Sequence, residues 1–559
     1  MNVSAPPPSL GFSVGIVGHR ANRIEDWDGV RARIDEILEA IQRSLDEIAE
    51  NPLFMAGRHP LRLVTALAEG ADRIAASSAL DLGQVLEVVL PFEPEEYEKD
   101  FPDEGPRNEF RELLRRASSL TVLDGHITGR PHAYEASGYT MLDNIDLLIA
   151  VWDGQPGRGR GGTREMIDAA ARRAMPVIVI PPDGSSLSVR GAIAGEPMRF
   201  EDIPEFPFDR LGDLVASLVG TLGDPVEEAD WRSLADLPPN PIIYGAYPFL
   251  LKLAGIRPWF AKKGSWTPKP PEGALEEAFA WWDHAAIQAA QAFRSAVLVN
   301  FSLAAFAVVL AASSVLVDDI KWIFVAAELL TILLLLTNAW HAGKMRWQER
   351  WLESRQVAEL LRVGILLRNV GIGRGISDPG AGGSNGWYAS SVARSCPMES
   401  IRLSDPDKAA EPVLAEIRDQ ASWNESTSHR MHLAAHRIER FGEVLFAIVI
   451  LAAGGWLITY FLDHELGTDL KYALTTITAG LPAIATASYG IRIILDFEGV
   501  ANRAHKIAHG LNAILKEWEA GPHTTITLQD MARRAADIML GDVAAWRLLA
   551  EGRRLTIPG

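Results

Sequence analysis

Residues 320–340 read IKWIFVAAELLTILLLLTNAW, and Lys321 and Glu328 are the only charged side chains in this run. A helix needs roughly 20 consecutive apolar residues to cross the hydrocarbon core of a bilayer. Three more stretches of this kind lie in the second half of the chain, at residues 296–317, 441–462 and 470–495. In a soluble protein all four would have to be buried on every side, so their hydropathy favours four membrane spans over buried core helices.

The spans form two pairs, and a short acidic loop joins each pair. Residues 317–320 read VDDI and residues 463–469 read DHELGTD. Basic residues gather at the opposite ends of the spans: Arg294, Lys344, Arg346, Arg350, Arg430, Arg437, Arg440, Arg503 and Lys506. Because Lys and Arg are enriched in cytoplasmic loops, the sequence predicts a multi-pass protein of the inner membrane. Both termini and the long middle segment are expected in the cytoplasm.

Composition restricts what the rest of the chain can do. Across 559 residues the net charge is −18, which argues against a surface that binds DNA or RNA by neutralising phosphates. The single cysteine, Cys396, excludes an intrachain disulfide and a thiolate-rich metal site. The first ten residues lack the basic start and apolar run of a cleavable signal, so membrane insertion is expected to rely on the spans.

The first part of the chain alternates short apolar runs with amphipathic stretches. The apolar runs are expected to be strands and lie at residues 12–17, 61–66, 85–90, 120–123, 146–152 and 176–180. Strands of this kind separated by helices predict a Rossmann-like α/β domain with a parallel sheet covered on both faces. Such sheets bind ligands beyond the carboxyl ends of their strands.

The loops that follow these strands carry the candidate ligand-binding residues. Glycines let the backbone approach a ligand closely, and a helix N-terminus after such a loop favours an anion. One Gly-Gly-Thr turn alone is more often structural, but five suitable loops on one edge favour a nucleotide-type ligand with a phosphate. The candidates are Gly18, His19, Arg20, Glu69, Gly70, Asp72, Arg73, Pro91, Phe92, Asp153, Gly154, Gly161, Gly162, Thr163 and Glu165. No cofactor or metal is required.

Two of these candidates suggest a catalytic alternative. Carboxylates beside a sugar can stabilise an oxocarbenium-like centre and position water, so Glu165 and Glu69 are the acid–base candidates if the domain is an enzyme. The competing interpretation of Glu165 is a favourable negative charge in the first turn of a helix.

The order of these motifs resembles the SLOG family of Rossmann-like nucleotide-binding domains. The matching segments are VGHR at 17–20, ALAEGADR at 66–73, LPF at 90–92 with Tyr97, Asp100 and Phe101, VWDG at 151–154, and GGT at 161–163. The resemblance covers residues 1–185 and implies that the glycine-rich edge binds a nucleotide or a nucleotide-derived signal. Some relatives cleave a base from a ribose phosphate and carry Pro-Gly-Gly-x-Gly-Thr followed by paired glutamates. Here Met166 stands in place of the second glutamate and the proline is missing, so the resemblance favours binding over catalysis.

The membrane half reads as a repeat of helix, span, span and helix, at residues 273–370 and 425–559. His284–Ala290 before the first span echoes His432–Ile438 before the third. Each unit resembles the SLATT (SMODS and SLOG-associating) effectors, whose helical hairpins are linked to nucleotide-signalled defence of bacteria against phages and are thought to perforate membranes. A connector at 186–272 and a flexible cytoplasmic loop or helix at 371–424 complete the predicted organisation.

Glu328 is the candidate pore residue. It lies about a third of the way into its span, and an ionisable residue at such depth usually faces the helix bundle or a water-filled path. The alternatives are an interhelical hydrogen bond and a position near the membrane interface. Four spans are few for a wide channel, so a homo-oligomer is expected to surround it.

The sequence therefore predicts a cytoplasmic sensor of a nucleotide-type signal, coupled to an effector in the lipid bilayer that opens or assembles a pore. The alternative is a membrane-anchored N-glycosidase or hydrolase that acts on a nucleotide or an NAD-like substrate.

Overall fold

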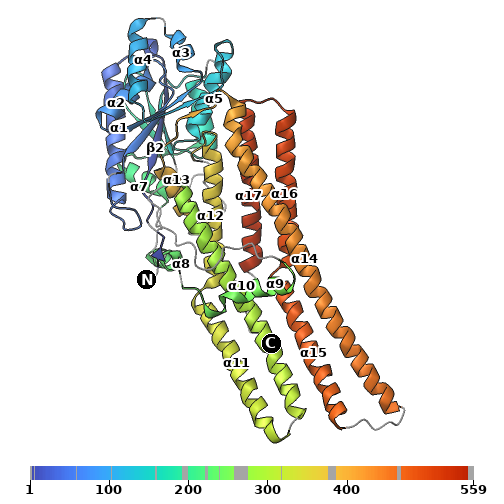
Figure 1. Ribbon diagram of the computed structural model, residues 1–559. Helices are drawn as coiled ribbons and strands as arrows, with labels where there is room; N and C mark the ends of the chain where they lie inside the picture. The colour runs from blue at the N-terminus through green and yellow to red at the C-terminus, as the bar shows by residue number, and fades with distance from the viewer. Residues whose placement is uncertain are drawn as a thin grey trace.

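The molecule is elongated, with an α/β domain at one end and four apolar helix segments at the other (Figure 1). The computed structural model describes residues 3–5, 7–57, 59–101, 103–157, 160–191, 199–220, 225–237, 239–256, 275–316, 318–374, 386–461 and 468–551. This arrangement confirms the predicted combination of an N-terminal parallel-dominated sheet and a helical region with candidate membrane spans.

The α/β domain is built on one sheet with the strand order β11-β5-β4-β3-β2-β6-β7-β8-β9. The strands from β11 to β7 in this order are parallel, and β8 and β9 are antiparallel. Their bounds are β2 (Phe12–Gly18), β3 (Leu61–Thr65), β4 (Val85–Leu90), β5 (Ser119–Val122), β6 (Leu147–Val151), β7 (Val177–Ile180), β8 (Ser188–Arg190), β9 (Glu205–Phe206) and β11 (Ile401–Arg402). A separate short pair joins β1 (Val3–Ser4) to β10 (Asp236–Leu237).

Helices cover both faces of this sheet, which is why its strands are continuous apolar runs. One face packs against α1 (Trp27–Ile48), α2 (Ala71–Asp81) and α4 (Glu104–Arg116), and the other against α5 (Arg130–Leu142) and α6 (Thr163–Arg172). Every residue of β3 and β6 is buried. The remaining helices of the first half are α3 (Pro94–Tyr97), α7 (Leu211–Val219), α8 (Pro225–Ala235) and α9 (Ala246–Leu253).

The described part of the second half of the chain contains seven long helices. They are α10 (Leu275–Ser313), α11 (Lys321–Lys344), α12 (Trp347–Arg368), α14 (Pro406–Phe461), α15 (Thr468–Ile494), α16 (Phe497–Ala520) and α17 (Thr525–Glu551). Among the described residues, four stretches are long and apolar enough to cross a membrane, and they overlap the four predicted spans. Most of the second acidic loop, residues 463–467, lies outside the described residues.

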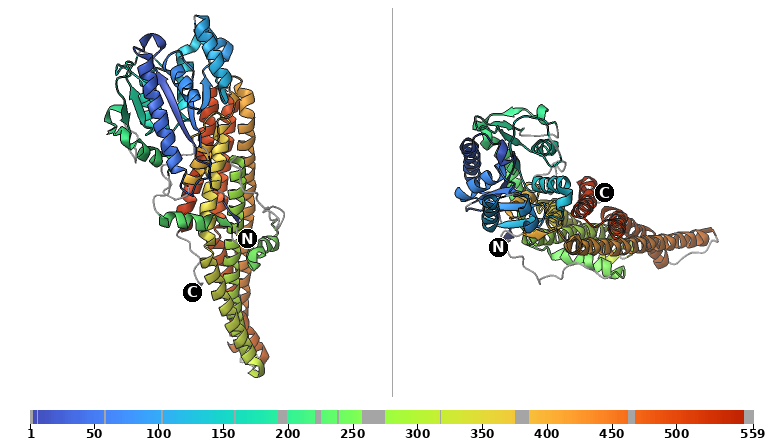
Figure 2. Two further views of the ribbon diagram at one scale, coloured as in Figure 1. Left: turned by 90° about the vertical axis from the view of Figure 1, so that its left-hand side faces the viewer. Right: turned by 90° about the horizontal axis from the view of Figure 1, so that it is seen from above.

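The apolar segments form a single row rather than a closed bundle. Packing runs from α11 to α10, from α10 to α15 and from α15 to α14, and the row is thin when seen from the side (Figure 1; Figure 2). The two hairpins meet where α10 crosses α15. A Cβ atom on Gly490 would lie 2.3 Å from the Phe301 ring, so a small residue permits this close approach.

The two helical units share an unusual joint. Arg346 separates α11 from α12 with φ 51°, and Asp496 separates α15 from α16 with φ 50°. Each is followed by a fully buried aromatic residue, Trp347 or Phe497. Residues other than glycine rarely adopt this left-handed conformation, so its recurrence at matching positions supports the repeat that the sequence suggested.

Residues 386–424 are more ordered than the sequence indicated. The expected flexible segment at 371–424 contains α13 (Gly386–Ser395), the edge strand β11 and the first turns of α14, which begins at Pro406 and not near 425. The reason is tertiary, because Trp387 and Tyr388 of α13 pack against Trp231 and join the core of the α/β domain. Residues 375–385 of this segment, and residues 257–274 that end the connector and begin the first unit, lie outside the described residues.

Candidate ligand site at the carboxyl edge of the sheet

The strand order reverses between β2 and β6, so the loops after these strands flank the switch point where such sheets bind ligands. His19 follows β2 and Asp153 follows β6. Their side chains meet, with His19 Nε2 3.3 Å from Asp153 Oδ1. Arg23 pairs with the same carboxylate. Burial alone would raise the pKa of Asp153, but the Gln155 N–H together with His19 and Arg23 lowers it below its ordinary value.

The glycines predicted to approach a ligand bring two loops together. Gly70 has φ +113°, and a Cβ atom there would lie 2.5 Å from the carbonyl oxygen of His19. The N–H of Ala71 donates to this same oxygen at 3.2 Å. A Cβ atom on Gly18 would lie 2.4 Å from the Cβ of Ala71. Gly18 and Gly70 therefore fix the β2 loop against the start of α2, which holds His19 and Arg20 at the edge.

Asp72 and Arg73 point into the protein rather than out of the edge. Asp72 accepts from Thr65 Oγ1 at 3.0 Å and from the Ala68 N–H at 3.3 Å. Burial raises the pKa of Asp72 to about 6, and the hydrogen bond from Thr65 opposes this shift. Arg73 is 1% exposed and pairs with Glu109 at 2.9 Å. These two predicted ligand residues hold the β3 loop and α2 in place.

Arg20 is the predicted cation that remains available at the edge. It is exposed, and its guanidinium carbon lies 5.9 Å from the centre of the Tyr134 ring on α5. Within the described part of the chain Arg20 makes no ion pair. An exposed guanidinium beside an aromatic ring is suited to an anion that carries a flat group.

Glu165 is paired with a carboxylate that the sequence did not single out. Glu165 Oε2 accepts from the Gly161 N–H at 2.8 Å, and the Glu165 side chain is hydrogen-bonded to Glu135 of α5. Burial and then this hydrogen bond raise the pKa of Glu135. The predicted partner Glu69 is half-buried in the β3 loop. Nothing in the local sequence marks Glu135, because its contact with the Gly161 loop is made between distant elements.

The loop after β6 ends at the start of α6. Gly161 has φ +72°, and a Cβ atom there would lie 2.7 Å from the backbone nitrogen of Glu135. Gly162 is the N-cap of α6 and supplies no capping side chain, so the N–H groups around Thr163 are open to an anion. Gly154 and Thr163 lie at the surface of this loop. Pro91 and Phe92 are buried, and the Phe92 ring packs against Tyr97 and Tyr134.

Among the described residues, the edge thus brings together one exposed cation without an ion pair, a helix start without a capping side chain, and a carboxylate pair. The described residues contain no group of three His, Cys, Asp or Glu side chains that could hold a metal ion. No protein-family model matches the chain, and the search of curated proteins finds no match.

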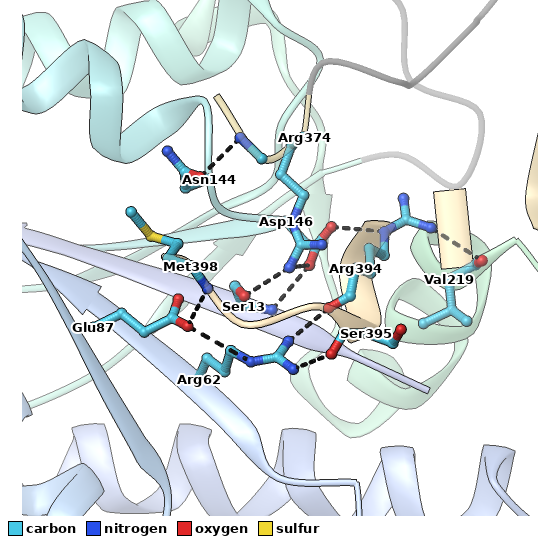
Figure 3. A network of polar contacts seen from close by, with 11 residues as sticks. Ser13, Arg62, Glu87, Asn144, Asp146, Val219, Arg374, Arg394, Ser395 and Met398 are labelled. Carbon is cyan, nitrogen blue, oxygen red and sulfur yellow. Dashed lines mark hydrogen bonds and ion pairs between the residues drawn. The ribbon is translucent and has the colours of Figure 1, made fainter. Parts of the chain in front are cut away.

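The opposite edge of the sheet carries a polar network that anchors Arg374 and residues 394–398 (Figure 3). Asp146, just before β6, accepts from the Ser13 N–H and from Arg394 Nε, both at 2.9 Å. Arg374 lies 3.4 Å from the same carboxylate, and burial lowers the pKa of Arg374 to about 10. Arg62 of β3 donates to the carbonyl oxygens of Arg394 and Ser395 at 2.6 Å each. This network fixes α13 to the amino ends of β2 and β3.

Proposed function

We propose that this protein is a cytoplasmic sensor of a nucleotide-type signal that controls an effector in the bacterial inner membrane. The resemblance of the edge motifs to SLOG domains and of the helical units to SLATT effectors supports this proposal, and it favours a role in defence against phages. The positive-inside rule favours cytoplasmic termini. The ligand is an anion with a flat group, which Arg20, Tyr134 and the N-terminus of α6 are suited to bind.

The observation that carries the proposal is a mechanical link between the candidate site and the helices. The first turns of α5 bear Tyr134 and Glu135 at the ligand edge. The last turn of α5 meets α17, where Gln529 Nε2 donates to Thr140 Oγ1 at 3.3 Å. Arg533 of α17 pairs with Asp143, which directly follows α5. A ligand that displaces α5 therefore also displaces α17.

From α17 the link reaches both helical units. This helix packs against α12 of the first unit and against α14 and α16 of the second (Figure 1). Its N-terminus is also tied to the sheet, since the Thr525 N–H donates to Asp124 at 2.9 Å. A ligand changes the arrangement of the two units only if it binds one arrangement more tightly than the other. Because α17 contacts both units, a ligand that favours one position of α17 also favours one arrangement of the units.

The row of spans explains why the effector is expected to work as an oligomer. One row of four helices cannot enclose water, so several chains have to combine. Glu328 is half-buried on α11, the outermost helix of the row, and makes no ion pair within the described residues. An edge helix is where a neighbouring chain can approach, so we place Glu328 beside the path. Glu328→Lys is expected to shift ion preference from cations towards anions in reconstituted vesicles. Unchanged preference would remove Glu328 from the path.

The link is tested by comparing two neighbouring arginines of α17. Arg533→Ala removes the ion pair with Asp143, whereas Arg534→Ala removes a surface ion pair with Glu517 of α16. We expect Arg533→Ala, combined with Gln529→Leu, to bind nucleotide normally but to lose ligand-triggered leakage of dye from vesicles. Arg534→Ala is expected to behave as wild type. Equal behaviour of the two variants would reject α17 as the link.

The Glu135–Glu165 pair favours a second candidate function, cleavage of an N-glycosidic bond in a nucleotide or an NAD-like compound. A carboxyl group whose pKa is raised by burial and by a neighbouring carboxylate is an arrangement found in glycoside hydrolysis. The test is turnover of NAD and AMP by the full chain. Release of nicotinamide or adenine that Glu165→Gln abolishes would establish the enzyme. Binding without product would leave the sensor.

A further inference from the structure

A cavity of about 510 Å³ separates the cytoplasmic parts of the two helical units. Helices α10 and α12 form one wall, α14 and α16 form the other, and Met539 of α17 also lines it. Its volume lies within the range of about 300–1,000 Å³ that is usual for small-molecule sites. It is distinct from the sheet edge, since all its lining residues belong to α9, α10, α12, α14, α16 and α17.

Buried polar atoms without partners face this cavity from both walls. Gln291 of α10 is 6% exposed, and its amide donates to the carbonyl oxygen of Tyr244 at 3.0 Å while Oε1 has no partner among the described residues. Thr427 of α14 is 4% exposed, and its hydroxyl also lacks a hydrogen-bond partner among the described residues. Most buried polar groups in native proteins have a hydrogen-bond partner, so these two oxygens are acceptors that an occupant of the cavity could use.

Arg294 is the arginine of the cavity that is open to an acidic group, although the carboxylates of Glu416 and Asp419 also line the cavity. Three other arginines line it, and each is paired with a carboxylate: Arg355 with Asp283 at 3.2 Å, Arg362 with Asp283 at 3.7 Å and Arg503 with Asp496 at 3.1 Å. Arg294 makes no ion pair with any described residue. Its guanidinium carbon lies 4.8 Å from the centre of the Trp351 ring and 5.4 Å from that of Tyr247. A half-buried cation between aromatic rings is suited to an anion with a flat ring.

The ligand reaches this cavity from the cytoplasm and not from the bilayer. On the membrane side an apolar cluster that includes Phe293, Ala296, Ile491 and Leu495 fills the space between the units. On the cytoplasmic side Asp419 and Trp423 line the cavity and are exposed. A lipid chain would have to displace the apolar cluster, whereas a soluble metabolite meets an open rim.

We propose that this cavity is a second ligand site, which binds a soluble organic anion that carries a flat ring together with a phosphate or carboxylate group. Arg294 binds the acidic group, its aromatic neighbours stack on the ring, and the Gln291 and Thr427 oxygens accept hydrogen bonds from the ligand. Because Gln291 and Thr427 belong to different units, an occupant joins the two units directly.

The test uses charge-selective modification of a cysteine in the full chain. Cys396→Ser removes the only cysteine, and Gln291→Cys then places a thiol one helical turn from Arg294. Rates are measured with anionic methanethiosulfonate ethylsulfonate and with its cationic trimethylammonium counterpart, each divided by its rate with N-acetylcysteine. We expect the anionic reagent to be favoured on the order of fivefold at low salt, and phenyl phosphate to slow the reaction more than inorganic phosphate does.

Two variants make the result specific. Arg294→Gln is expected to abolish both the anion preference and the protection by phenyl phosphate, whereas Arg111→Gln, an exposed arginine on α4, leaves both unchanged. Thr427→Cys repeats the measurement from the opposite wall, in case Gln291→Cys destabilises the protein. Preference for the cation, or an anion preference that survives Arg294→Gln, would overturn the proposal. So would a failure of phenyl phosphate to protect either cysteine. Arg20→Gln is expected to change none of these rates, so the result does not depend on the sheet edge.

Discussion

Arg20 and Arg73 have the same side chain and lie at the same end of the sheet, but they have different roles because their surroundings differ. Arg20 is exposed beside Tyr134, and Arg73 is buried with its charge matched by Glu109. Sequence motifs suggested that both bind phosphate. Only the structure distinguishes the two roles, because Arg73 contacts Glu109 of α4, which lies 36 residues further along the chain.

We expect these two arginines to separate binding from stability. Arg73→Gln removes the hydrogen bonds that the buried guanidinium donates to the Leu67 and Pro106 carbonyl oxygens, and should lower the free energy of unfolding by about 1–3 kcal/mol. Arg20→Gln should change it by no more than about 0.5 kcal/mol while weakening nucleotide binding. Denaturant titration and equilibrium binding of the full chain check both. If Arg20→Gln were as destabilising as Arg73→Gln, this division of roles would be wrong.

Asp72 makes stability depend on pH. Its pKa is raised to about 6 in the folded protein from 3.8, so the folded state holds the proton more tightly than the unfolded state does. The stabilising contribution of Asp72 to the free energy of unfolding is therefore fully present below about pH 4, and it is lost as the pH rises towards and past 6. The free energy of unfolding of Asp72→Asn should equal that of wild type at pH 4, and it should exceed that of wild type by about 1–3 kcal/mol at pH 7.5. Urea titrations at the two pH values measure this, and a variant weaker than wild type at pH 7.5 would contradict it.

At the scale of elements, the contact between α10 and α15 holds the two hairpins together. Gly490 and Phe301 meet there, whereas Gly454 of α14 has no atom within 4 Å of the position of a Cβ. Both glycines lie in candidate spans, so they form a matched pair for mutation.

We expect Gly490→Ala to lower the thermal unfolding temperature of the protein in detergent, because its Cβ would overlap the Phe301 ring. Overpacking of this kind typically costs about 1–3 kcal/mol. Gly454→Ala should be neutral, and Phe301→Ala should rescue part of the Gly490→Ala defect. A neutral Gly490→Ala would show that the hairpins do not pack in this way.

The elements that the sequence predicted well are those with a local signal. The runs that became β2 to β7 and the four spans are apolar enough to be recognised alone. The strand β11 and helix α13 could not be recognised, since β11 has two residues and α13 depends on Trp231 and on Arg62. Glu135 was missed for the same reason, because its pairing with Glu165 joins α5 to α6. Gly18, Gly70 and Gly161 were expected near a ligand, and in the structure each also allows two backbone segments to pack closely.

At the scale of the molecule, the long helices place the candidate ligand edge far from the apolar row, at opposite ends of the protein (Figure 1). Any signal therefore has to travel along helices, and α17 is the helix that contacts both α5 and the two units. The row itself offers broad apolar surfaces, with Leu329, Leu330, Ile450 and Leu451 among its exposed residues. Lipid or neighbouring chains have to cover these side chains.

The proposed orientation predicts where reporters are accessible. A reporter inserted at Asp318, between α10 and α11, or at Thr468, at the start of α15, should read as periplasmic. One at Glu399, between α13 and β11, should read as cytoplasmic. Alkaline phosphatase and green fluorescent protein fusions distinguish the two sides. Periplasmic reporting from Glu399 would invert the topology and place the candidate ligand edge outside the cell.

The central claim, that a nucleotide bound at the sheet edge opens the membrane, is tested most directly by leakage from sealed vesicles. The full chain is reconstituted into vesicles that contain carboxyfluorescein and is exposed to AMP, ATP, NAD, ADP-ribose and cyclic dinucleotides. We predict that at least one of these releases the dye at the concentrations at which it binds, and that Arg20→Gln abolishes both binding and release. The account would be contradicted if one of these nucleotides bound at the edge and none of them released dye from wild-type vesicles.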